Sequence, residues 1–237
     1  MCIRDSLRTA DLVTVAWKLM QKEFSEFNSN VQFINNGYDI AESDKKIERD
    51  KKFSISHIGI MNPDRNPRTL WKVLKKIGEA KPEFLEDLEI KLIGKISPDV
   101  IDSIKASDLE KQLNIINYVP HYQVHDLQKA CQMLLLVINS TPTAKGIIPG
   151  KVFEYLISKR PIIVVGPEDG DSAGIIKECE AGQAFNFDEA DKLEAYILES
   201  YEKYKAGNLE VNSHGIEKYS RRNLTKVLSG HMNELLT

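Results

Sequence analysis

The sequence predicts a doubly wound α/β domain, in which helices cover both faces of a parallel β-sheet. From residue 53 onward, short apolar runs rich in β-branched residues alternate with amphipathic segments of helical period, which is the pattern of successive βα units. Residues 133–138 are apolar throughout, as expected for a strand buried on both faces. The 237 residues are 42% hydrophobic, which is enough for a packed core and excludes a disordered chain.

The elements of this domain follow from the alternation. Strands are expected over residues 53–60, 88–93, 113–116, 133–138 and 161–165. Helices are expected over residues 67–80, 98–106, 123–130, 150–158, 172–180, 188–204 and 216–236. Ligands of such sheets bind beyond the carboxyl ends of the strands. The candidate binding loops are therefore residues 59–66, 94–98, 117–122, 139–151 and 166–172.

Two shorter strands, at residues 12–16 and 31–34, flank a helical segment before the main domain. Residues 41–52 are almost all polar and have no apolar period, as in a solvated connector. We therefore divide the chain into four parts: residues 1–40, a linker at 41–52, a domain at 53–205 and a helical tail at 206–237. The first six residues run abruptly into sequence typical of the middle of a domain, so we expect a truncated reading frame with a foreign leader.

Composition excludes several classes of partner and compartment. With 32 Lys plus Arg against 35 Asp plus Glu, the chain has no diffuse positive field, so we expect no nucleic-acid partner. The longest apolar run is far short of the ~20 residues of a membrane-spanning helix. Three widely spaced cysteines suggest no disulfide framework, and the N-terminus has no secretory signal. A cytoplasmic location is the expectation.

The loop after the first strand of the main domain is a candidate phosphate site. Gly59 allows close approach of a ligand to the strand end, and Arg65 places a permanent cation beside the start of a helix. The alternative is that Arg65 is an ordinary solvated charge.

The loop after residues 133–138 is a second candidate. Gly146, Pro149 and Gly150 lead into a predicted helix, whose first amides and positive dipole end can receive a diphosphate. Lys151 lies in the first turn, and Glu154 can accept two hydrogen bonds from a ribose. The alternative, equally supported by these residues, is that Glu154 favours the helix dipole and Lys151 is solvated.

The order of these motifs resembles the donor-binding half of retaining GT-B-fold glycosyltransferases of the group 1, family 4-like type. The resemblance spans residues 31–186. It rests on Asn36-Gly37-x-Asp39, the strand ending at Gly59 with a basic residue six positions on, Tyr118-Val119-Pro120, Pro149-Gly150-Lys151-Val152-Phe153-Glu154-Tyr155-Leu156 and Pro161-Ile162-Ile163.

The resemblance implies roles for individual residues. Arg65 matches the basic residue that clamps the donor diphosphate, and Glu154 matches the carboxylate that contacts the ribose. Two positions depart from the family pattern: Ile60 stands where a clamp arginine is usual, and Gly146 stands where a sugar-contacting glutamate is usual. We expect Lys151 to supply the missing positive charge.

The resemblance also places the nucleobase near Tyr118 and Val119. It implies transfer of a sugar from a nucleoside diphosphate sugar, UDP-linked, to a hydroxyl of a glycan or lipid-linked acceptor, with retention and with neither metal nor cofactor. We expect this chain to bind the donor and to transfer sugar poorly or not at all. The rival hypothesis is a non-catalytic nucleotide-sugar-binding module, which the glycine at position 146 favours. A weaker third is a nucleotide-sugar 2-epimerase.

Other motifs favour structural interpretations. Asp169-Gly170-Asp171 has the spacing of a metal-binding DxD motif, but we interpret it as a turn with Ser172 as the helix N-cap. His121 and His125 share a helical spacing without a third ligand nearby. A basic patch in the tail allows peripheral membrane contact, although a solvated face is the stronger expectation; it consists of Lys218, Arg221, Arg222 and Lys226.

Overall fold

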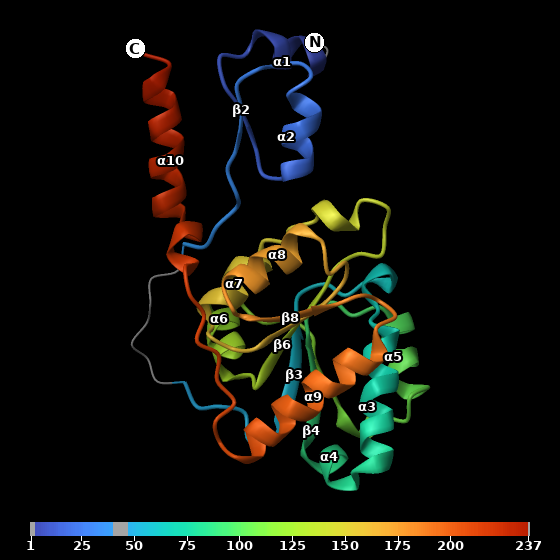
Figure 1. The fold of residues 1–237 in the computed structure, drawn as a ribbon. Coiled ribbons are helices and arrows are strands. Elements are labelled where there is room, and N and C mark those ends of the chain that lie inside the picture. Colours follow the sequence, from blue (N-terminus) through green and yellow to red (C-terminus); the bar gives the residue numbers. More distant parts are fainter. Residues whose placement is uncertain (1–2, 40–46, 237) are drawn as a thin grey trace.

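The computed structural model describes residues 3–39 and 47–236, and its larger part is built on one six-stranded sheet (Figure 1). The strands are β3 (Phe53–Ile58), β4 (Leu88–Ile93), β5 (Leu113–Ile116), β6 (Met133–Val137), β7 (Ile162–Val165) and β8 (Gly182–Phe185). Their order is β5-β4-β3-β6-β7-β8, and every neighbouring pair is parallel. The doubly wound α/β prediction is confirmed.

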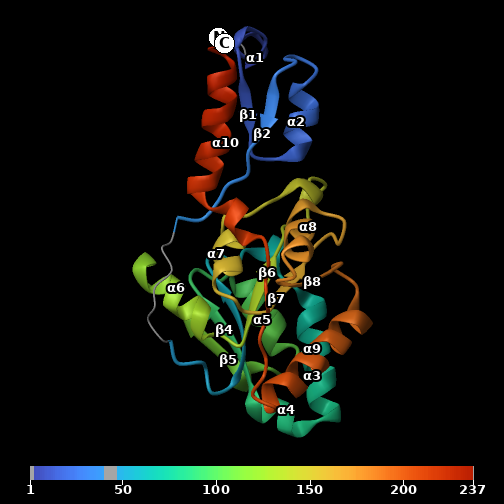
Figure 2. The same cartoon turned by 60° about the vertical axis from the view of Figure 1, so that its left-hand side comes forward.

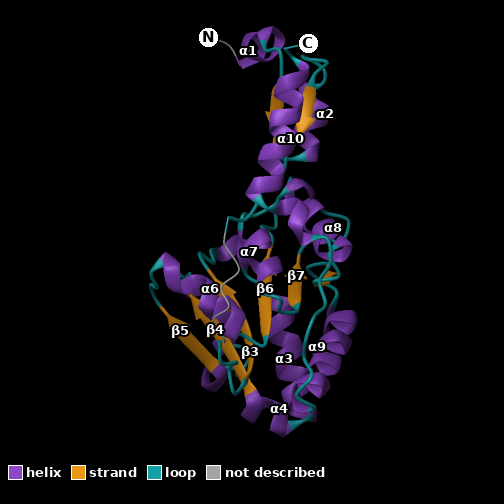
Figure 3. Ribbon diagram, turned by 90° about the vertical axis from the view of Figure 1, so that its left-hand side faces the viewer, coloured by secondary structure: helices purple, strands orange, loops and turns teal. Residues whose placement is uncertain are grey.

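Helices cover both faces of this sheet (Figure 3). One buried cluster joins the sheet to α3 (Arg68–Ala80), α4 (Pro82–Asp87), α5 (Pro98–Lys105) and α9 (Ala190–Lys205). A second cluster joins the opposite face to α6 (His121–Ala130), α7 (Lys151–Ile157) and α8 (Asp171–Glu178). Because both faces are covered, all six side chains of β3 are buried.

A small unit precedes this domain. It consists of α1 (Ile3–Thr9), β1 (Val13–Val15), α2 (Lys18–Phe24) and β2 (Val31–Phe33), and its two parallel strands share a core of Val13, Val15 and Val31. The last helix, α10 (Arg221–Glu234), runs beside this unit rather than against the large sheet (Figures 1 and 2). Tyr38 joins the two parts, since it accepts a backbone hydrogen bond from Arg221 and donates one to Tyr219.

The linker expected at residues 41–52 lies partly outside the described residues, which resume at residue 47. Among the described residues, no helix combines the length and apolarity needed to span a bilayer.

The structure adds three elements that the sequence did not predict: α1, α4 and β8. Their apolar patterns are weak, because each has only four to seven residues and β8 reads Gly-Gln-Ala-Phe. Several predicted boundaries also move, and two of these shifts have a clear local cause. The first strand ends at Ile58 because Gly59 adopts φ +124°, and the last helix begins only after Ser220, whose side chain caps it by accepting from Asn223 N.

Candidate functional site

The sheet opens between β3 and β6, where the strand order changes direction. These strands pair only through Ile55–Met133 and Ser56–Leu134, whereas β3 stays paired with β4 as far as Ile58–Ile93. Beyond Ser56 the two halves of the sheet therefore separate toward their carboxyl ends. In doubly wound folds this switch point forms the ligand-binding crevice.

Side chains of α7 bind the backbone groups of β3 that the opening leaves unpaired. The Tyr155 hydroxyl accepts a hydrogen bond from Ile58 N at 3.1 Å. The Lys151 ammonium donates to the Ile58 carbonyl oxygen at 2.8 Å. Tyr155 and Lys151 are four residues apart and so lie on the same face of α7. This face of α7 is thereby fixed to the end of β3.

His57 fills the opening itself. Its ring is fully buried, and Nδ1 donates to the Leu135 carbonyl oxygen of β6 at 3.0 Å. Nε2 lies 3.4 Å from both Lys151 Nζ and the Ile60 carbonyl oxygen. Burial, and then the Lys151 charge, lower the pKa of His57 to about 3. The imidazole is therefore neutral near pH 7 and bridges the two strands, as a satisfied core residue does.

Gly59 is where the backbone passes closest to these groups. Its φ of +124° is costly for any residue with a side chain. A Cβ atom placed there would lie 2.7 Å from Lys151 Nζ, and one placed on Gly94 would lie 2.6 Å from the Gly59 carbonyl oxygen. The two glycines thus allow β3, β4 and Lys151 to meet in one place.

Arg65 reaches the same place from the short 3-10 turn η1 (Pro63–Arg65). Its Nε donates to Asn139 Oδ1 at 2.7 Å, and its Nη1 donates to the Ile60 carbonyl oxygen at 3.3 Å. Asn139 was not predicted as a site residue. Its position in the loop that follows the buried run 133–138 is the signal that could have indicated it.

Two cations and one carboxylate set the charge of this crevice. Burial, followed by repulsion from Arg65, lowers the pKa of Lys151 to about 8, while Glu154 acts in the opposite direction. Glu154 Oε2 accepts a hydrogen bond from Gln128 Nε2 at 3.0 Å. The side chains of Arg65, Lys151 and Glu154 are all half-buried. The crevice therefore carries an excess of positive charge, which suits an anion.

The expectation of free amides at the start of the helix is wrong in part. The amides of Val152 and Phe153 donate to the carbonyl oxygens of Pro149 and Gly150 at 3.0 and 3.2 Å. Gly150 is the N-cap residue with helical dihedrals, and no side chain caps the helix. Any anion bound in this crevice would be held chiefly by side-chain cations.

A cavity of about 500 Å³ lies beside the crevice, over the ends of β3, β4 and β5. Gly59, Tyr118 and Val119 line it together with apolar side chains such as Ile58, Ile93 and Val124. The ring of Tyr118 is 83% exposed. The structure thus places the predicted nucleobase residues next to the predicted phosphate residues. Gly146, in contrast, is buried, and a Cβ atom on it would meet Leu19 of α2 at 3.6 Å.

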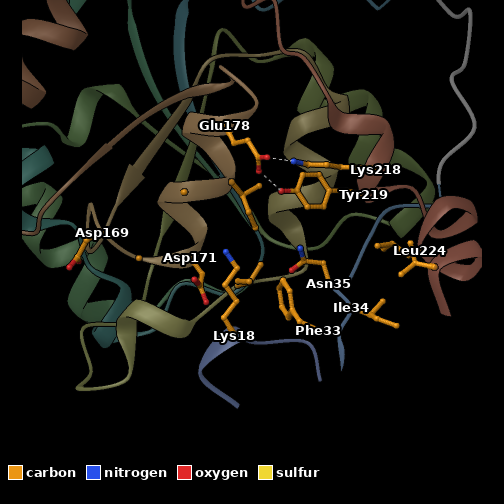
Figure 4. A pocket seen from close by; sticks show the side chains of 15 residues that line it. Lys18, Phe33, Ile34, Asn35, Asp169, Asp171, Glu178, Lys218, Tyr219 and Leu224 are labelled. Carbon is orange, nitrogen blue, oxygen red and sulfur yellow. Dashed lines mark hydrogen bonds and ion pairs between the residues drawn. The ribbon is translucent and has the colours of Figure 1, made fainter. Parts of the chain in front are cut away.

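A second cavity, of about 700 Å³, lies between the N-terminal unit, α8 and the start of α10 (Figure 4). Glu178 on its wall accepts hydrogen bonds from Lys218 and, at 3.1 Å, from the Tyr219 hydroxyl. None of the predicted donor-binding residues lines this cavity. It is a different place from the crevice at the switch point.

Asp169 lies in the turn before α8, where it forms an ion pair with Lys145 at 2.5 Å that lowers the pKa of the carboxyl. The helix begins at Asp171, so the N-cap is Gly170 and not Ser172 as predicted. Ser172 instead donates to the Ile147 carbonyl oxygen at 2.6 Å. Within the described ranges, no group of three or more His, Cys, Asp or Glu side chains could hold a metal ion.

Solved structures with the same fold include several glycosyltransferases. A mutant of S. aureus TarM in complex with Fondaparinux, alpha-GlcNAc-glycerol and UDP superposes with a TM-score of 0.66 at 16% identity, covering 99% of this chain and 46% of that one. The pneumococcal O-GlcNAc transferase GtfA, in complex with UDP and GlcNAc, gives 0.64 at 14% identity, covering 96% and 46%. A glycosyltransferase from Rickettsia africae gives 0.67 at 13% identity, covering 99% and 67%.

These likenesses confirm the GT-B fold expected from the sequence motifs. The chain spans about half the length of the first two of these structures. No protein-family model matches it, and no curated protein sequence does so significantly.

Proposed function

We propose that this chain is the donor-binding part of a glycosyltransferase that moves a sugar from a nucleoside diphosphate sugar, UDP-linked, to a hydroxyl of a glycan or lipid-linked acceptor. The observation that carries the proposal is the convergence of Arg65 and Lys151 on the two neighbours of Gly59 at the switch point of the sheet. Arg65 donates to the Ile60 carbonyl oxygen, and Lys151 donates to the Ile58 carbonyl oxygen. Two cations from elements far apart in sequence meet there, where doubly wound folds bind nucleotides.

The surroundings fit the other parts of such a donor. The cavity lined by Tyr118 and Val119 is mostly apolar and suits a nucleobase, and the solved structures with UDP bound favour uracil. Glu154 supplies a carboxylate for the ribose hydroxyls. The hydrogen bond that Glu154 accepts from Gln128 holds this carboxylate in place.

The chemistry assigned to this part of the protein is electrostatic. Breaking the bond between the sugar and the diphosphate develops negative charge on the departing oxygen. Arg65 is held by Asn139 and the Ile60 carbonyl oxygen, so its charge is in place before the reaction begins. Cations fixed in this way stabilise a transition state without the cost of reorganisation.

Thermal unfolding in the presence of UDP, GDP, ADP or CMP tests the proposal. UDP should raise the melting temperature most, because it is the proposed donor nucleotide. A ligand at a hundred times its dissociation constant adds about 2.7 kcal/mol of stability. Arg65→Gln and Glu154→Gln should each reduce that shift. Arg68→Gln, a change of an exposed arginine three positions after Arg65, is the matched control and should leave it intact. Equal shifts in all four proteins would refute the assigned site.

The rival proposal of a non-catalytic binding module has one observation in its favour. The position of the sugar-contacting glutamate is Gly146, which is buried against Leu19 and offers no carboxylate. Release of UDP from a panel of UDP-sugars, with and without acceptors, tests the module. Any turnover by this chain would refute a non-catalytic module, whereas tight binding without turnover is expected both of the module and of the donor-binding part of a transferase.

A further inference from the structure

We propose that Lys151 is a phosphate-binding cation that changes its partner when ligand binds. Without ligand, its ammonium donates to the carbonyl oxygen of Ile58. When a nucleoside diphosphate binds, the ammonium leaves Ile58 and pairs with the phosphate beside Arg65. This inference rests on the proposed function, which already places Lys151 at the diphosphate. It adds the release of Lys151 from Ile58 on binding and a dependence of donor binding on pH.

The position of Lys151 supports this role. Its ammonium lies 2.8 Å from the Ile58 carbonyl oxygen and 3.4 Å from His57 Nε2. Both partners are neutral, so neither contact compensates the charge of the half-buried ammonium. Charged groups normally leave water only when paired. A dianionic phosphate would supply the missing pair.

Gly59 provides the space in which the Lys151 ammonium lies. A side chain there would collide with Lys151 Nζ, since even a Cβ atom would lie only 2.7 Å from it. Gly59 also lines the neighbouring cavity, so Lys151 Nζ and the bound nucleotide would share the surface of the same residue.

Three ionisable groups face the ammonium: His57 from β3, Arg65 from η1 and Glu154 from its own helix. His57 is neutral above pH 5, because its pKa is about 3. The guanidinium of Arg65 repels the ammonium. The Glu154 side chain accepts a hydrogen bond from Gln128 and opposes only part of the repulsion from Arg65. The crevice is therefore ready to accept negative charge.

Binding should consume protons at alkaline pH. Lys151 has a pKa of about 8 in the ligand-free chain, and a phosphate beside it would raise that pKa. With the bound lysine fully charged, UDP binding takes up about 0.1 proton at pH 7 and about 0.9 at pH 9. The terminal phosphate, with a second pKa near 6, is already ionised at pH 8 and above and does not contribute there.

The rival role is purely structural, in which Lys151 only satisfies the end of β3. Isothermal titration calorimetry with UDP, at pH 7, 8 and 9 and in two buffers of different ionisation enthalpy, separates the roles. The proteins are the wild-type chain, Lys151→Met, Lys151→Arg and, as control, Lys177→Met, which changes an exposed lysine of α8. Circular dichroism checks that each variant is folded.

We expect Lys151→Met to weaken UDP binding about tenfold or more at pH 7, as loss of a charge-assisted hydrogen bond does. Lys151→Arg should keep most of the affinity and lose the proton uptake at pH 9, because arginine does not titrate there. Lys177→Met should behave like the wild type.

Two results would overturn the inference while leaving the proposed function intact. One is UDP binding to Lys151→Met with wild-type affinity. The other is a wild-type chain that binds UDP with no proton uptake at pH 9, a result that needs no variant to fold. A folded wild-type chain that binds no UDP would instead refute the proposed function and this inference with it.

Discussion

His57 and Lys151 are two bases whose surroundings disfavour their charged forms. His57 is buried between strands with its Nδ1 committed to Leu135, and Lys151 is half-buried beside Arg65. Their positions follow from the opening between β3 and β6, which leaves polar backbone atoms that these side chains bind. The same contacts make the stability of the chain depend on pH.

Acidification should destabilise the fold through His57. Its pKa falls from 6.5 in the unfolded chain to about 3 in the fold. Below pH 6.5 the unfolded state therefore binds a proton that the folded state does not, and the free energy of unfolding decreases as pH falls. Between pH 7 and 5 this loss amounts to about 2 kcal/mol.

Urea denaturation of the wild type and of His57→Asn at pH 7 and pH 5 measures the effect. The variant should lose about 2 kcal/mol less than the wild type between the two pH values. Asparagine keeps a donor for the Leu135 carbonyl oxygen, and all other titrating groups are common to both proteins. An equal loss in the two proteins would show that His57 accepts a proton in the fold.

The sequence predicted Gly59 and the two cations of the crevice, but not the contacts of Asn139 and Tyr155 that fix the crevice. Gly59, Arg65 and Lys151 lie in loops or at a helix start that the predicted strands already marked. Asn139 binds Arg65, which lies 74 residues away in the sequence, and Tyr155 binds Ile58, which lies 97 residues away. No local pattern encodes contacts over such separations. Lys151 was expected beside the helix end and instead reaches back to β3.

At the scale of elements, α7 is the helix that fixes the crevice. Its residues Val152, Phe153 and Leu156 pack in the core, while Lys151 and Tyr155 bind the end of β3. The apolar period predicted this helix to within one residue at each end. Strand β8 was not predicted because its four residues include a glycine and a glutamine and show no apolar pattern. Its position in the sheet follows from its pairing with β7.

Tyr155→Phe should destabilise the chain by about 1–3 kcal/mol, because the buried amide of Ile58 loses its acceptor. Burial raises the pKa of Tyr155, so the hydroxyl stays un-ionised over the accessible range. Tyr122→Phe is the control, since that ring is 77% exposed, and it should change stability by less than about 0.5 kcal/mol. Urea denaturation of both variants gives the comparison; two equally small changes would mean that water or a shifted backbone replaces the hydroxyl.

At the scale of the whole molecule, two clusters of apolar side chains hold a complete parallel sheet, and a much smaller core holds the N-terminal unit. The sequence predicted the sheet because each βα unit has a clear local pattern. It did not predict that α10 would lie beside the N-terminal unit, because that contact joins the two ends of the chain (Figure 2). The division into domains at residues 41–52 stays a prediction.

The central claim is that the switch point between β3 and β6 binds a nucleoside diphosphate. A crystal structure of the chain with UDP tests this most directly. The account predicts the diphosphate over Gly59, within hydrogen-bond distance, about 3 Å, of both the Arg65 guanidinium and Lys151 Nζ, with the uracil beside Val119. UDP in the cavity between α8 and α10, or a diphosphate that contacts neither cation, would contradict it.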